Sequence, residues 1–306
     1  MTRTHMPRTS IDDWDGQPLW HFEQDDTVIE GVRALCRLGV GLRCESWLAH
    51  SRTHGVVTVK LCRPHEVGTA KGVRAMRREA DSLRLVQHHA IRPLLAERLD
   101  ADIPALIFQH AAGSSLSEHL DEATLSPMHA LDMVASLVGA LAATHRAGLV
   151  HLDVKPSNII VRPNRFDRPM LIDFGSARPN GWDPGPGTPP GSPGYAPPEV
   201  ERNERITPAV DVYGLGTVLY EAITGEAAFD PDLDAADRPL PPQPSDLADW
   251  APASIDRLVA DLLAPDPLDR PHLEQVDRAV GRMRDELDKA AGGWTSRSLQ
   301  HLWGDR

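Results

Sequence analysis

Two segments of the chain carry side chains that suit the transfer of a phosphoryl group. VHLDVKPSNIIV, residues 150–161, places Asp153, Lys155 and Asn158 in a short loop between a helix and an apolar strand. Further along, LIDFGSAR ends a second strand at Asp173. Phosphoryl transfer from ATP needs a carboxylate that orients the attacking hydroxyl, oxygen ligands for Mg²⁺, and a cation on the transferred group. Asp153 fits the first role and Lys155 the third. Asn158 and Asp173 offer the oxygen ligands.

A glycine-containing segment near the N-terminus could hold the phosphates. LGVGLRCESWLAH, residues 38–50, begins the pattern G-x-G-x-x-G with Gly39 and Gly41, but Cys44 occupies the third glycine position. Two glycines in a turn are common, so this segment alone does not distinguish a nucleotide site from a plain β-hairpin. Lys60 ends the next apolar strand, in VVTVK, where a lone lysine is usually solvated. These residues gain meaning only from the rest of the chain.

Strands and one helix are predicted for the first third of the chain. β-Branched and apolar residues favour strands on both sides of the glycine turn, over residues 55–64 (GVVTVKLCRP) and over residues 104–111 (PALIFQHA). Residues 69–86 carry apolar side chains at helical spacing among many charges, which predicts one amphipathic helix.

The rest of the chain is predicted to be mainly helical. Ser126-Pro127 and Thr207-Pro208 are helix start signals, with Ser or Thr as the N-cap and Pro as the first helical residue. The second signal precedes AVDVYGLGTVLYEAITG, which is apolar nearly all round and is therefore expected to be a central buried helix. SIDRLVADLLA and HLEQVDRAVGRMRDELDKAA are predicted to form the closing helices.

These patterns predict an α+β fold with two lobes, a β-rich N-lobe with one main helix and a larger α-helical C-lobe. We expect an N-terminal extension over 1–29, the N-lobe over 30–111, the C-lobe over 112–290 and a C-terminal tail over 291–306. The lobes would be hinged near residues 109–115, and ligands favour clefts at such junctions.

Composition narrows the class of protein. The 306 residues are 41% hydrophobic and 25% charged, which is typical of a soluble globular protein, and the net charge of −12 argues against nucleic-acid binding. No apolar run reaches the ~20 residues of a membrane span, and the N-terminus lacks a secretory signal. Three cysteines are too few for a disulfide framework. We therefore expect a cytoplasmic protein without a membrane segment.

The motifs, taken in order, resemble the eukaryotic-type (Hanks-type) serine/threonine protein kinases, in the soluble form found in bacteria. The similarity covers roughly residues 30–285. HLDVKPSN matches the catalytic loop H-R-D-x-K-x-x-N, DFG is intact from Asp173 onward, and VVTVK matches V-A-I-K. The resemblance implies the bilobal protein-kinase fold, ATP with Mg²⁺ or, alternatively, Mn²⁺, and protein Ser or Thr hydroxyls as substrates.

The resemblance also assigns roles to residues outside these motifs. Lys60 would contact the α- and β-phosphates and pair with Glu79 on the amphipathic helix. Asp211 in VDVYGLG would anchor the backbone of the catalytic loop. Glu199, which ends GSPGYAPPE, would pair with Arg270 in PDPLDRP. These last three residues argue for the fold rather than for the chemistry.

The same matching outlines the nucleotide site. Its predicted residues are Leu38, Gly39, Val40, Gly41, Ser46, Thr58, Lys60, Phe108, Gln109, Ala111 and Ile160. Ser46 and Thr58 stand where the family usually has Val and Ala, so the roof over the adenine is expected to be more polar. The C=O of Gln109 and the N–H of Ala111 would bond the base. The bulky Phe108 predicts poor access for inhibitors that need a back pocket.

The predicted activation segment departs from the family pattern. Leu152 replaces the arginine that normally binds a phosphorylated residue of this segment, so activity is expected not to need phosphorylation at Thr188. Residues 179–198 are rich in Pro and Gly, which excludes a helix and favours a stiff loop. Ser192 matches the family's threonine that contacts the catalytic Asp and Lys.

Two further departures concern the surface and Cys44. The segment over residues 229–253 is short and interrupted by prolines. The family usually has an extra surface helix there, so we expect that helix to be reduced to a turn or absent. The third glycine is the one most often replaced in the family, so Cys44 is expected to be tolerated. Redox control through Cys44 is the alternative interpretation.

Alternatives to a protein kinase remain at this point. The chain could be a pseudokinase-like ATP-binding regulatory or scaffold module, although its Lys, Asp, Asn and Asp set is intact. A small-molecule kinase is less consistent with the sequence, because those enzymes lack the segment around Glu199 and its arginine. The tail, with Trp294 and Trp303, could dock on the large lobe or on a partner, or could be a frayed terminus.

Overall fold

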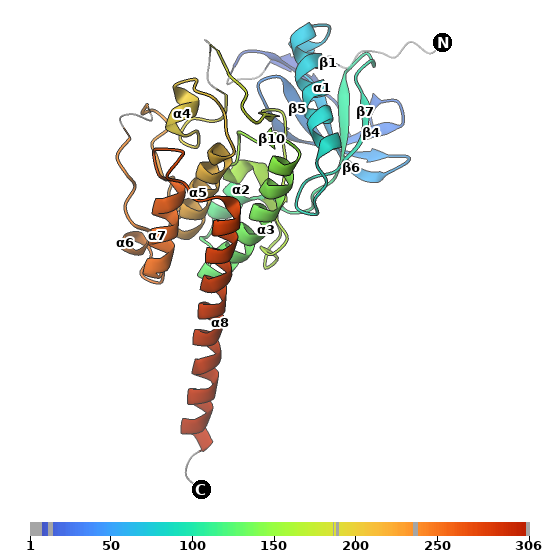
Figure 1. The fold of residues 1–306 in the computed structure, drawn as a ribbon. Coiled ribbons are helices and arrows are strands. Elements are labelled where there is room, and N and C mark those ends of the chain that lie inside the picture. The colour runs from blue at the N-terminus through green and yellow to red at the C-terminus, as the bar shows by residue number, and fades with distance from the viewer. Residues whose placement is uncertain (1–7, 12–14, 186, 188–189, 235–237, 304–306) are drawn as a thin grey trace. The chain divides into compact units, whose positions relative to one another are not determined.

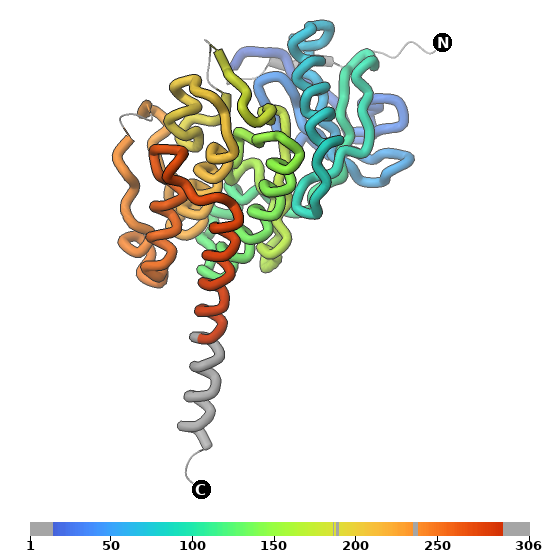
Figure 2. The backbone as a smooth tube through the Cα atoms, viewed as in Figure 1, coloured from blue at the N-terminus to red at the C-terminus, as the bar shows by residue number. Residues whose placement is uncertain are grey.

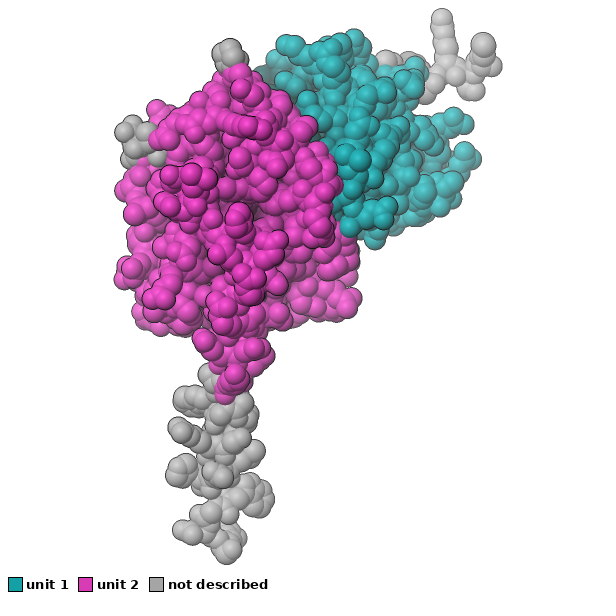
Figure 3. Space-filling view, in the orientation of Figure 1, with its two compact units in different colours: residues 1–87, 91–112, 173–175 teal, residues 88–90, 113–172, 176–306 magenta. Residues whose placement is uncertain are grey.

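The computed structural model describes residues 8–11, 15–185, 187, 190–234 and 238–303 (Figure 1), with the backbone alone for 8–11 and 290–303. Two compact units make up the chain (Figure 3). The first contains the residues up to 87, residues 91–112 and residues 173–175. The second contains residues 88–90, residues 113–172 and the residues from 176 onward.

A six-stranded antiparallel sheet forms the frame of the first unit. Its strands lie in the order β3-β4-β5-β6-β8-β7. Their bounds are β3 Thr27–Ile29, β4 Val32–Val40, β5 Cys44–Ser51, β6 Gly55–Cys62, β7 Leu94–Arg98 and β8 Ala105–Gln109. The strands predicted around the glycine turn, and the two that follow them, are confirmed. β6 is rich in β-branched residues, which suit a strand with a neighbour on each side.

One helix, α1 (Ala70–Leu85), packs against β6, β7 and β8. It begins after Thr69, whose hydroxyl accepts a hydrogen bond from the N–H of Gly72 at 3.1 Å and so satisfies one free donor of the first turn. The buried side chains that join the helix to the sheet are Cys62, Met76, Ala80, Leu99, Leu106 and Phe108. The amphipathic helix predicted over residues 69–86 is thereby confirmed.

The segment that precedes the sheet contributes to the core of the first unit. β1 (Arg8–Ile11) pairs with β2 (Pro18–His21) in a two-stranded antiparallel sheet, and β3 pairs with β4. Several apolar side chains of this segment are buried, namely Leu19, Trp20, Phe22, Val28 and Ile29. The region that the sequence set apart as an extension over 1–29 therefore contains residues of the same hydrophobic core as the sheet.

Helices dominate the second unit. They are α2 (Leu116–Leu120), α3 (Pro127–Arg146), α4 (Pro198–Glu201), α5 (Ala209–Thr224), α6 (Pro244–Leu247), α7 (Ala253–Leu262) and α8 (Leu273–Trp303). α5 packs against α3, α6 and α7, and α3 also packs against α8; their backbone path can be followed in Figure 2. Nearly every side chain of α5 is buried, which confirms the central helix predicted from its apolar sequence.

Short strands complete the second unit. β9 (Ser114–Ser115), β11 (Ile159–Val161) and β12 (Met170–Leu171) form one small sheet in the order β12-β11-β9. β10 (Leu149–Val150) pairs with β13 (Arg178–Pro179). These pairs frame the catalytic-loop sequence, whose 3₁₀ turn η2 spans Pro156–Asn158.

The two helix start signals have different outcomes. Ser126 caps α3 as predicted, because its hydroxyl accepts a hydrogen bond from the N–H of His129 at 3.3 Å and Pro127 is the first helical residue. The prediction for α5 is wrong by one residue. Pro208 itself is the N-cap, with helical φ of −52°, and this N-cap makes no side-chain hydrogen bond.

α3 has the length and apolar composition of a membrane-crossing helix, although no run of the sequence was expected to reach that limit. Half of its most apolar window is buried inside the structure, and the helix packs against α5 and α8. A core helix of a folded protein has the same properties, and α3 has that environment here.

The segment between α5 and α7 contains one short helix. α6 has four residues, so the prediction that the family's surface helix is reduced to a turn is confirmed for the described part of residues 229–253. At the C-terminus the backbone of α8 continues to Trp303, so residues 291–303 of the predicted tail are helical.

Candidate active site

Lys60, Glu79 and Asp173 form one hydrogen-bonded group in the first unit, which we call the Lys60 cluster. Lys60 lies near the end of β6, and its Nζ donates to Glu79 Oε2 at 2.7 Å and to Asp173 Oδ1 at 2.8 Å. Glu79 comes from the buried face of α1, and its side chain is 2% exposed. The sheet and the helix thus bring together residues that are far apart in the sequence.

The pKa values of the Lys60 cluster are shifted by burial and by the neighbouring charges. Burial acts to lower the pKa of Lys60, but the carboxylates of Asp173 and Glu79 reverse this and raise it, so the ammonium stays charged. Burial acts to raise the pKa of Asp173, yet the Lys60 ammonium holds it well below its ordinary value. For Glu79, burial prevails and the pKa is raised.

Gly175 lies close to the carboxylate of Asp173. Its N–H donates to Asp173 Oδ1 at 3.1 Å. A Cβ at position 175 would lie 3.0 Å from the same oxygen and 3.7 Å from Nζ of Lys60. Asp173 itself adopts a left-handed φ of 64°, which turns the backbone between the strand and Gly175. The DFG sequence therefore fits a tight polar turn in which a Cβ at position 175 would press on the Asp173 carboxylate.

The glycine turn joins β4 to β5. Leu38, Gly39 and Val40 are the last residues of β4. Gly39 pairs with Ser46 across the strands, and the N–H of Gly41 donates to the C=O of Cys44 at 2.8 Å. A Cβ at Gly39 would meet no atom within 4 Å, so the backbone there borders open space. A ligand could approach this backbone closely, which is the use of glycine in phosphate loops.

The residues predicted around the adenine lie mostly on β6 and β8. The buried Thr58 has its hydroxyl 3.2 Å from Nδ1 of His110, so the polar group predicted for the roof has a partner within the first unit. Gln109 ends β8, and its N–H donates to the C=O of Pro93 at 3.0 Å. Ala111 follows two residues later and is buried.

Phe108 is fully buried, with a cation stacked on its ring. The guanidinium carbon of Arg92 lies 4.1 Å from the ring centroid, a cation–π distance. Arg92 is itself buried, and among the described residues its Nε has no hydrogen-bond partner. Burial lowers the pKa of Arg92, while Glu79 and Asp173 oppose that shift. Sequence analysis missed this residue, because an arginine before a proline carries no signal of burial.

Asp153, Lys155, Asn158 and Ser192 form the corresponding group of the second unit, which we call the Asp153 cluster. Ser192 Oγ donates to Asp153 Oδ1 at 2.7 Å, and Nδ2 of Asn158 donates to Asp153 Oδ2 at 2.8 Å. Lys155 Nζ lies 3.1 Å from Asp153 Oδ2 and donates to Ser192 Oγ at 2.5 Å. The contact that the resemblance implied for Ser192 is present in this geometry.

Asp211 binds the backbone that leads into the Asp153 cluster. Its carboxylate oxygens accept the N–H groups of His151 and Leu152 at 2.8 and 2.9 Å. Nε2 of His145 lies 2.8 Å from the same carboxylate. Burial acts to raise the pKa of Asp211, but these hydrogen bonds lower it overall, so the anchor stays ionised. Sequence analysis missed His145, which stands six residues before His151 near the end of α3.

Leu152 packs where the resemblance would place a charged side chain. It adopts a left-handed φ of 70° and is buried in an apolar cluster. The other buried members are Val150, Ala196, Val200, Ile206 and Val210, with Trp182 packed against them. Backbone hydrogen bonds of 2.7 and 2.9 Å also join residues 181–182 to Ile206. We call these residues the Leu152 cluster. They join the catalytic loop to both ends of the predicted activation segment.

Glu199 and Arg270 form a buried ion pair in the second unit. Nη1 and Nη2 of Arg270 donate to the two carboxylate oxygens of Glu199 at 2.5 and 2.9 Å. Arg270 also donates to the carbonyls of Ala264 and Ala209. The pair fixes the start of α4 to the segment before α8. Of the remaining predicted residues, Ile160 lies in β11, and Thr188 lies outside the described residues.

The residues present fit ATP and a divalent cation. Gly39 leaves backbone accessible for phosphate, and Lys60 supplies a permanent ammonium. Asp173 keeps an ionised carboxylate, and Asn158 commits its amide nitrogen to Asp153, which leaves oxygen as its metal-ligating atom. Among the described residues, no three His, Cys, Asp or Glu side chains gather into a metal site. A Mg²⁺ ion held by one or two side chains and substrate phosphates needs no such cluster.

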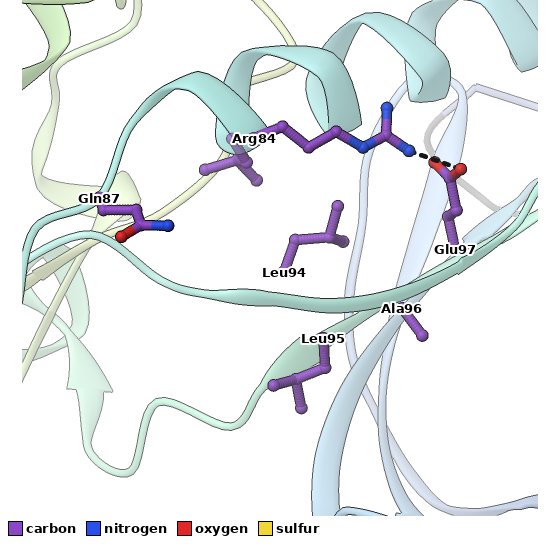
Figure 4. A pocket seen from close by; sticks show the side chains of 7 residues that line it. Arg84, Gln87, Leu94, Leu95, Ala96 and Glu97 are labelled. Carbon is purple, nitrogen blue, oxygen red and sulfur yellow. Dashed lines mark ion pairs between the residues drawn. The ribbon is translucent and has the colours of Figure 1, made fainter.

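One pocket of the first unit lies apart from these residues. It has a volume of about 420 Å³ and is lined by the C-terminal half of α1 and by β7 (Figure 4). Arg84 pairs with Glu97 at its edge at 2.5 Å, and Leu94 lies beneath the helix. None of the residues predicted for the site lines it.

Comparisons with known proteins bear on this geometry. Residues 34–279 match the family model of the protein kinase domain. PknD of Mycobacterium tuberculosis is 34% identical over 250 residues, which cover 78% of this chain and 37% of PknD. PknL of the same organism is 33% identical, covering 70% of this chain and 55% of PknL. PkaA of Streptomyces coelicolor is 32% identical, covering 73% and 42%. All three are named serine/threonine-protein kinases, and the chain matches roughly a third to a half of their length.

A solved structure shares the fold. The crystal structure of the M. tuberculosis PknI kinase domain, determined on a mutant form, matches with a TM-score of 0.66. The match covers 86% of this chain and 98% of that domain at 21% identity. The predicted fold class is thereby confirmed: an α+β protein with a β-sheet unit and a mainly helical unit.

Proposed function

Because this chain belongs to the protein kinase family, we propose that it transfers the γ-phosphate of ATP to serine and threonine hydroxyls of proteins. The observation that carries the proposal is that the Lys60 cluster and the Asp153 cluster are each complete and hydrogen-bonded in their own unit. Each polar group that phosphoryl transfer requires has a residue to supply it. Substrates and partners of the whole protein are part of the proposal.

In the proposed reaction the second unit orients the acceptor. Asp153 accepts a hydrogen bond from the attacking hydroxyl, while Ser192 and Asn158 hold its carboxylate in place. Asp211 holds the backbone before Asp153 through two N–H groups, so the carboxylate is presented on a rigid loop. Lys155 places its ammonium beside the same carboxylate, where it neutralises charge on the transferred group.

The first unit supplies the groups that bind the nucleotide. Lys60 holds the α- and β-phosphates, and Glu79 fixes the lysine by a 2.7 Å hydrogen bond. The backbone of Gly39 and Gly41 covers the phosphates. The C=O of Gln109 and the N–H of Ala111 bond the base. A Mg²⁺ ion held by Asp173 and Asn158 would neutralise the phosphates when bound.

We further propose that activity does not depend on phosphorylation of the activation segment. In kinases that need it, an arginine beside the catalytic Asp binds the added phosphate. Here Leu152 occupies that position and is buried among apolar side chains. The apolar contacts and the backbone bonds of residues 181–182 to Ile206 hold the segment without a phosphate.

The rival functions differ in their expected products. A pseudokinase-like module would bind ATP and transfer nothing, yet no residue required for transfer is replaced in the two clusters. A small-molecule kinase would label a metabolite instead of a protein, but the buried Glu199–Arg270 pair belongs to the segment that such enzymes lack. That the protein acts in the cytoplasm stays a prediction from the sequence.

A transfer assay tests the proposed function. The purified protein is incubated with radiolabelled ATP, Mg²⁺ and a generic protein acceptor, and labelled Ser or Thr residues are located by mass spectrometry. Asp153→Asn and Asp173→Asn should each lower the rate roughly 10³-fold or more, because each removes a charge used in the transition state. The exposed Asp167, changed to Asn, is the matched control and should leave the rate unchanged. No transfer by the wild type, or an equal rate in Asp173→Asn, contradicts the proposal.

A further inference from the structure

Arg63 has an unusual position at the end of β6. Its side chain is fully buried, the largest such side chain among the described residues. A buried guanidinium needs partners for its donors, because an unpaired charge away from water is costly. The partners of Arg63 lie on two sides of it, one formed by the glycine turn and the other by the N-terminal segment. Neither contact follows from the kinase motifs.

On the first side, Arg63 binds two carbonyls of the glycine turn. Its backbone N–H donates to the C=O of Arg43 at 2.9 Å. Its Nη1 donates to the C=O of Gly41 at 3.2 Å. The turn between β4 and β5 is therefore held at Gly41 and at Arg43 by one residue. The N–H of Gly41, which donates to Cys44 at 2.8 Å, closes the turn from within.

On the second side, Arg63 binds the segment that precedes the sheet. Its Nη1 and Nη2 bond the two carboxylate oxygens of Asp15 at 2.5 and 3.0 Å, a bidentate pair. Nη2 also donates to the C=O of Gln17 at 3.1 Å. The hydrogen bond from Arg63 holds the pKa of Asp15 below its ordinary value, so the carboxylate is ionised at neutral pH.

A second set of bonds joins the same segment to the strands beside the turn. The N–H of Trp20 donates to Oε1 of Glu45, the second residue of β5, at 2.7 Å. The indole N–H of Trp20 donates to the C=O of Cys62 at 2.7 Å. Arg37 of β4 donates to the C=O of Trp20 at 2.5 Å and pairs with Glu45. β4, β5 and β6 are thus each bonded to Trp20.

We infer that residues 15–20 are a buttress for the glycine turn, and that Asp15 and Arg63 are positioning residues for ATP. The buttress holds the turn through Arg63, so the backbone of Gly41 is fixed before the nucleotide arrives. A turn ordered in advance loses less conformational entropy when it closes over phosphates. The role in ATP binding rests on the proposed function, whereas the restraint on the turn does not.

Hydrogen exchange measures the restraint without any need for activity. In Asp15→Asn the guanidinium of Arg63 keeps a similar neighbour but loses its counter-charge. We expect the amides of residues 38–44 to exchange faster by roughly threefold to tenfold, the scale of one weakened charge-assisted hydrogen bond. Asp26→Asn is the matched control, because Asp26 lies in the same segment and accepts a hydrogen bond from the N–H of Glu23, away from the turn. It should leave exchange in residues 38–44 at the wild-type rate.

Kinetics then separate positioning from general damage. For Asp15→Asn we expect the KM for Mg·ATP to rise by a similar factor, while kcat and the KM for the protein acceptor stay within about twofold. Trp20→Phe is a second variant that keeps an aromatic ring in the core but removes the indole N–H bond to Cys62 and part of the buried ring. It keeps the test valid if Asp15→Asn does not fold, and it should increase exchange in the same residues.

Two results would overturn the inference. One is an exchange rate in residues 38–44 of Asp15→Asn that equals the wild-type rate. If Asp15→Asn does not fold, the same comparison is made with Trp20→Phe. The other is a fall of kcat in Asp15→Asn while the KM for Mg·ATP stays at the wild-type value. A wild-type protein that binds no ATP or transfers no phosphate refutes the proposed function. The exchange comparison still decides whether the buttress exists.

Discussion

Cys44 stands at the third position of the glycine pattern, and its side chain packs against the buried cluster between α1 and the sheet. Burial raises the pKa of its thiol to about 12, and that of Cys62 to about 11. The thiolate is the form that reacts with oxidants and alkylating reagents. A thiol with so high a pKa is a poor redox sensor, so this geometry favours the interpretation that Cys44 is merely tolerated.

Alkylation of the native protein checks this at single-residue resolution. At pH 8 a thiol with a pKa near 12 is ionised to only about 10⁻⁴, so Cys44 should react with iodoacetamide at least tenfold more slowly than the exposed Cys36. Mass spectrometry of peptides at early times gives both rates, and alkylation in urea confirms that all three cysteines can be labelled. Modification of Cys44 as fast as Cys36, with loss of ATP binding, would restore the redox hypothesis.

At the scale of elements, the catalytic loop and the activation segment are joined by contacts of two kinds. Ser192 bonds Asp153 and Lys155, which are polar contacts at the site. The Leu152 cluster joins the same elements away from the site through apolar side chains. Apolar contacts do not depend on a modification, because they gain stability by removing surface from water. These contacts support the proposal that the described residues of the segment are held without a phosphate.

A phosphorylation-site variant tests that conclusion. Thr188→Ala should retain kcat/KM within about twofold of the wild type if, as proposed, the buried Leu152 cluster takes the place of a phosphate. The wild type treated with a phosphatase, and shown by intact mass to carry no phosphate, should behave in the same way. A fall of tenfold or more in both samples would mean that the segment needs phosphate after all.

At the scale of the molecule, the first folded unit begins earlier in the sequence than the match to the family model. The match begins at residue 34, but β2 and β3 precede it and carry buried side chains of the first unit's core. A chain that starts at residue 34 loses Leu19, Trp20, Phe22, Val28, Ile29 and Val32 from that core. Each buried apolar side chain contributes about 1.5–3 kcal/mol, so the sum is comparable with a typical free energy of unfolding, about 5–15 kcal/mol.

Truncation is therefore expected to prevent folding. A protein that starts at residue 34 should give little soluble product and no cooperative thermal transition by circular dichroism. A control that starts at residue 8, before β1, should melt like the full chain. A cooperative transition for the shorter protein at a similar temperature would show that the N-terminal strands are dispensable.

Local patterns predicted the elements well, and for a physical reason. β6, α1, α3 and α5 are defined by side-chain periodicity and caps, which a single segment contains in full. The N-terminal strands β2 and β3 are only four and three residues long and sit among charges, so they have too few residues to show a period. At α5 the sequence does not show whether Pro208 is the N-cap or the first helical residue, because its φ is helical in either case.

The site divides in the same way between motif and context. Lys60, Asp153 and Asp173 belong to spaced motifs, and the sequence identified them. In the sequence Arg63 and Arg92 look like ordinary charged residues. Only the tertiary structure shows that Arg63 binds carbonyls and a carboxylate and that Arg92 stacks on an aromatic ring. Burial of a charge depends on what several distant segments place around it, which no local pattern contains.

The Leu152 cluster also has a consequence in time. A kinase whose active form needs a phosphate keeps a record of past signals until a phosphatase erases it. A segment held by apolar contacts keeps no such record, and no phosphatase can reset it. If the proposed function holds, the rate of phosphoryl transfer depends on the present concentrations of nucleotide, acceptor and the protein itself. It does not depend on earlier phosphorylation of the segment.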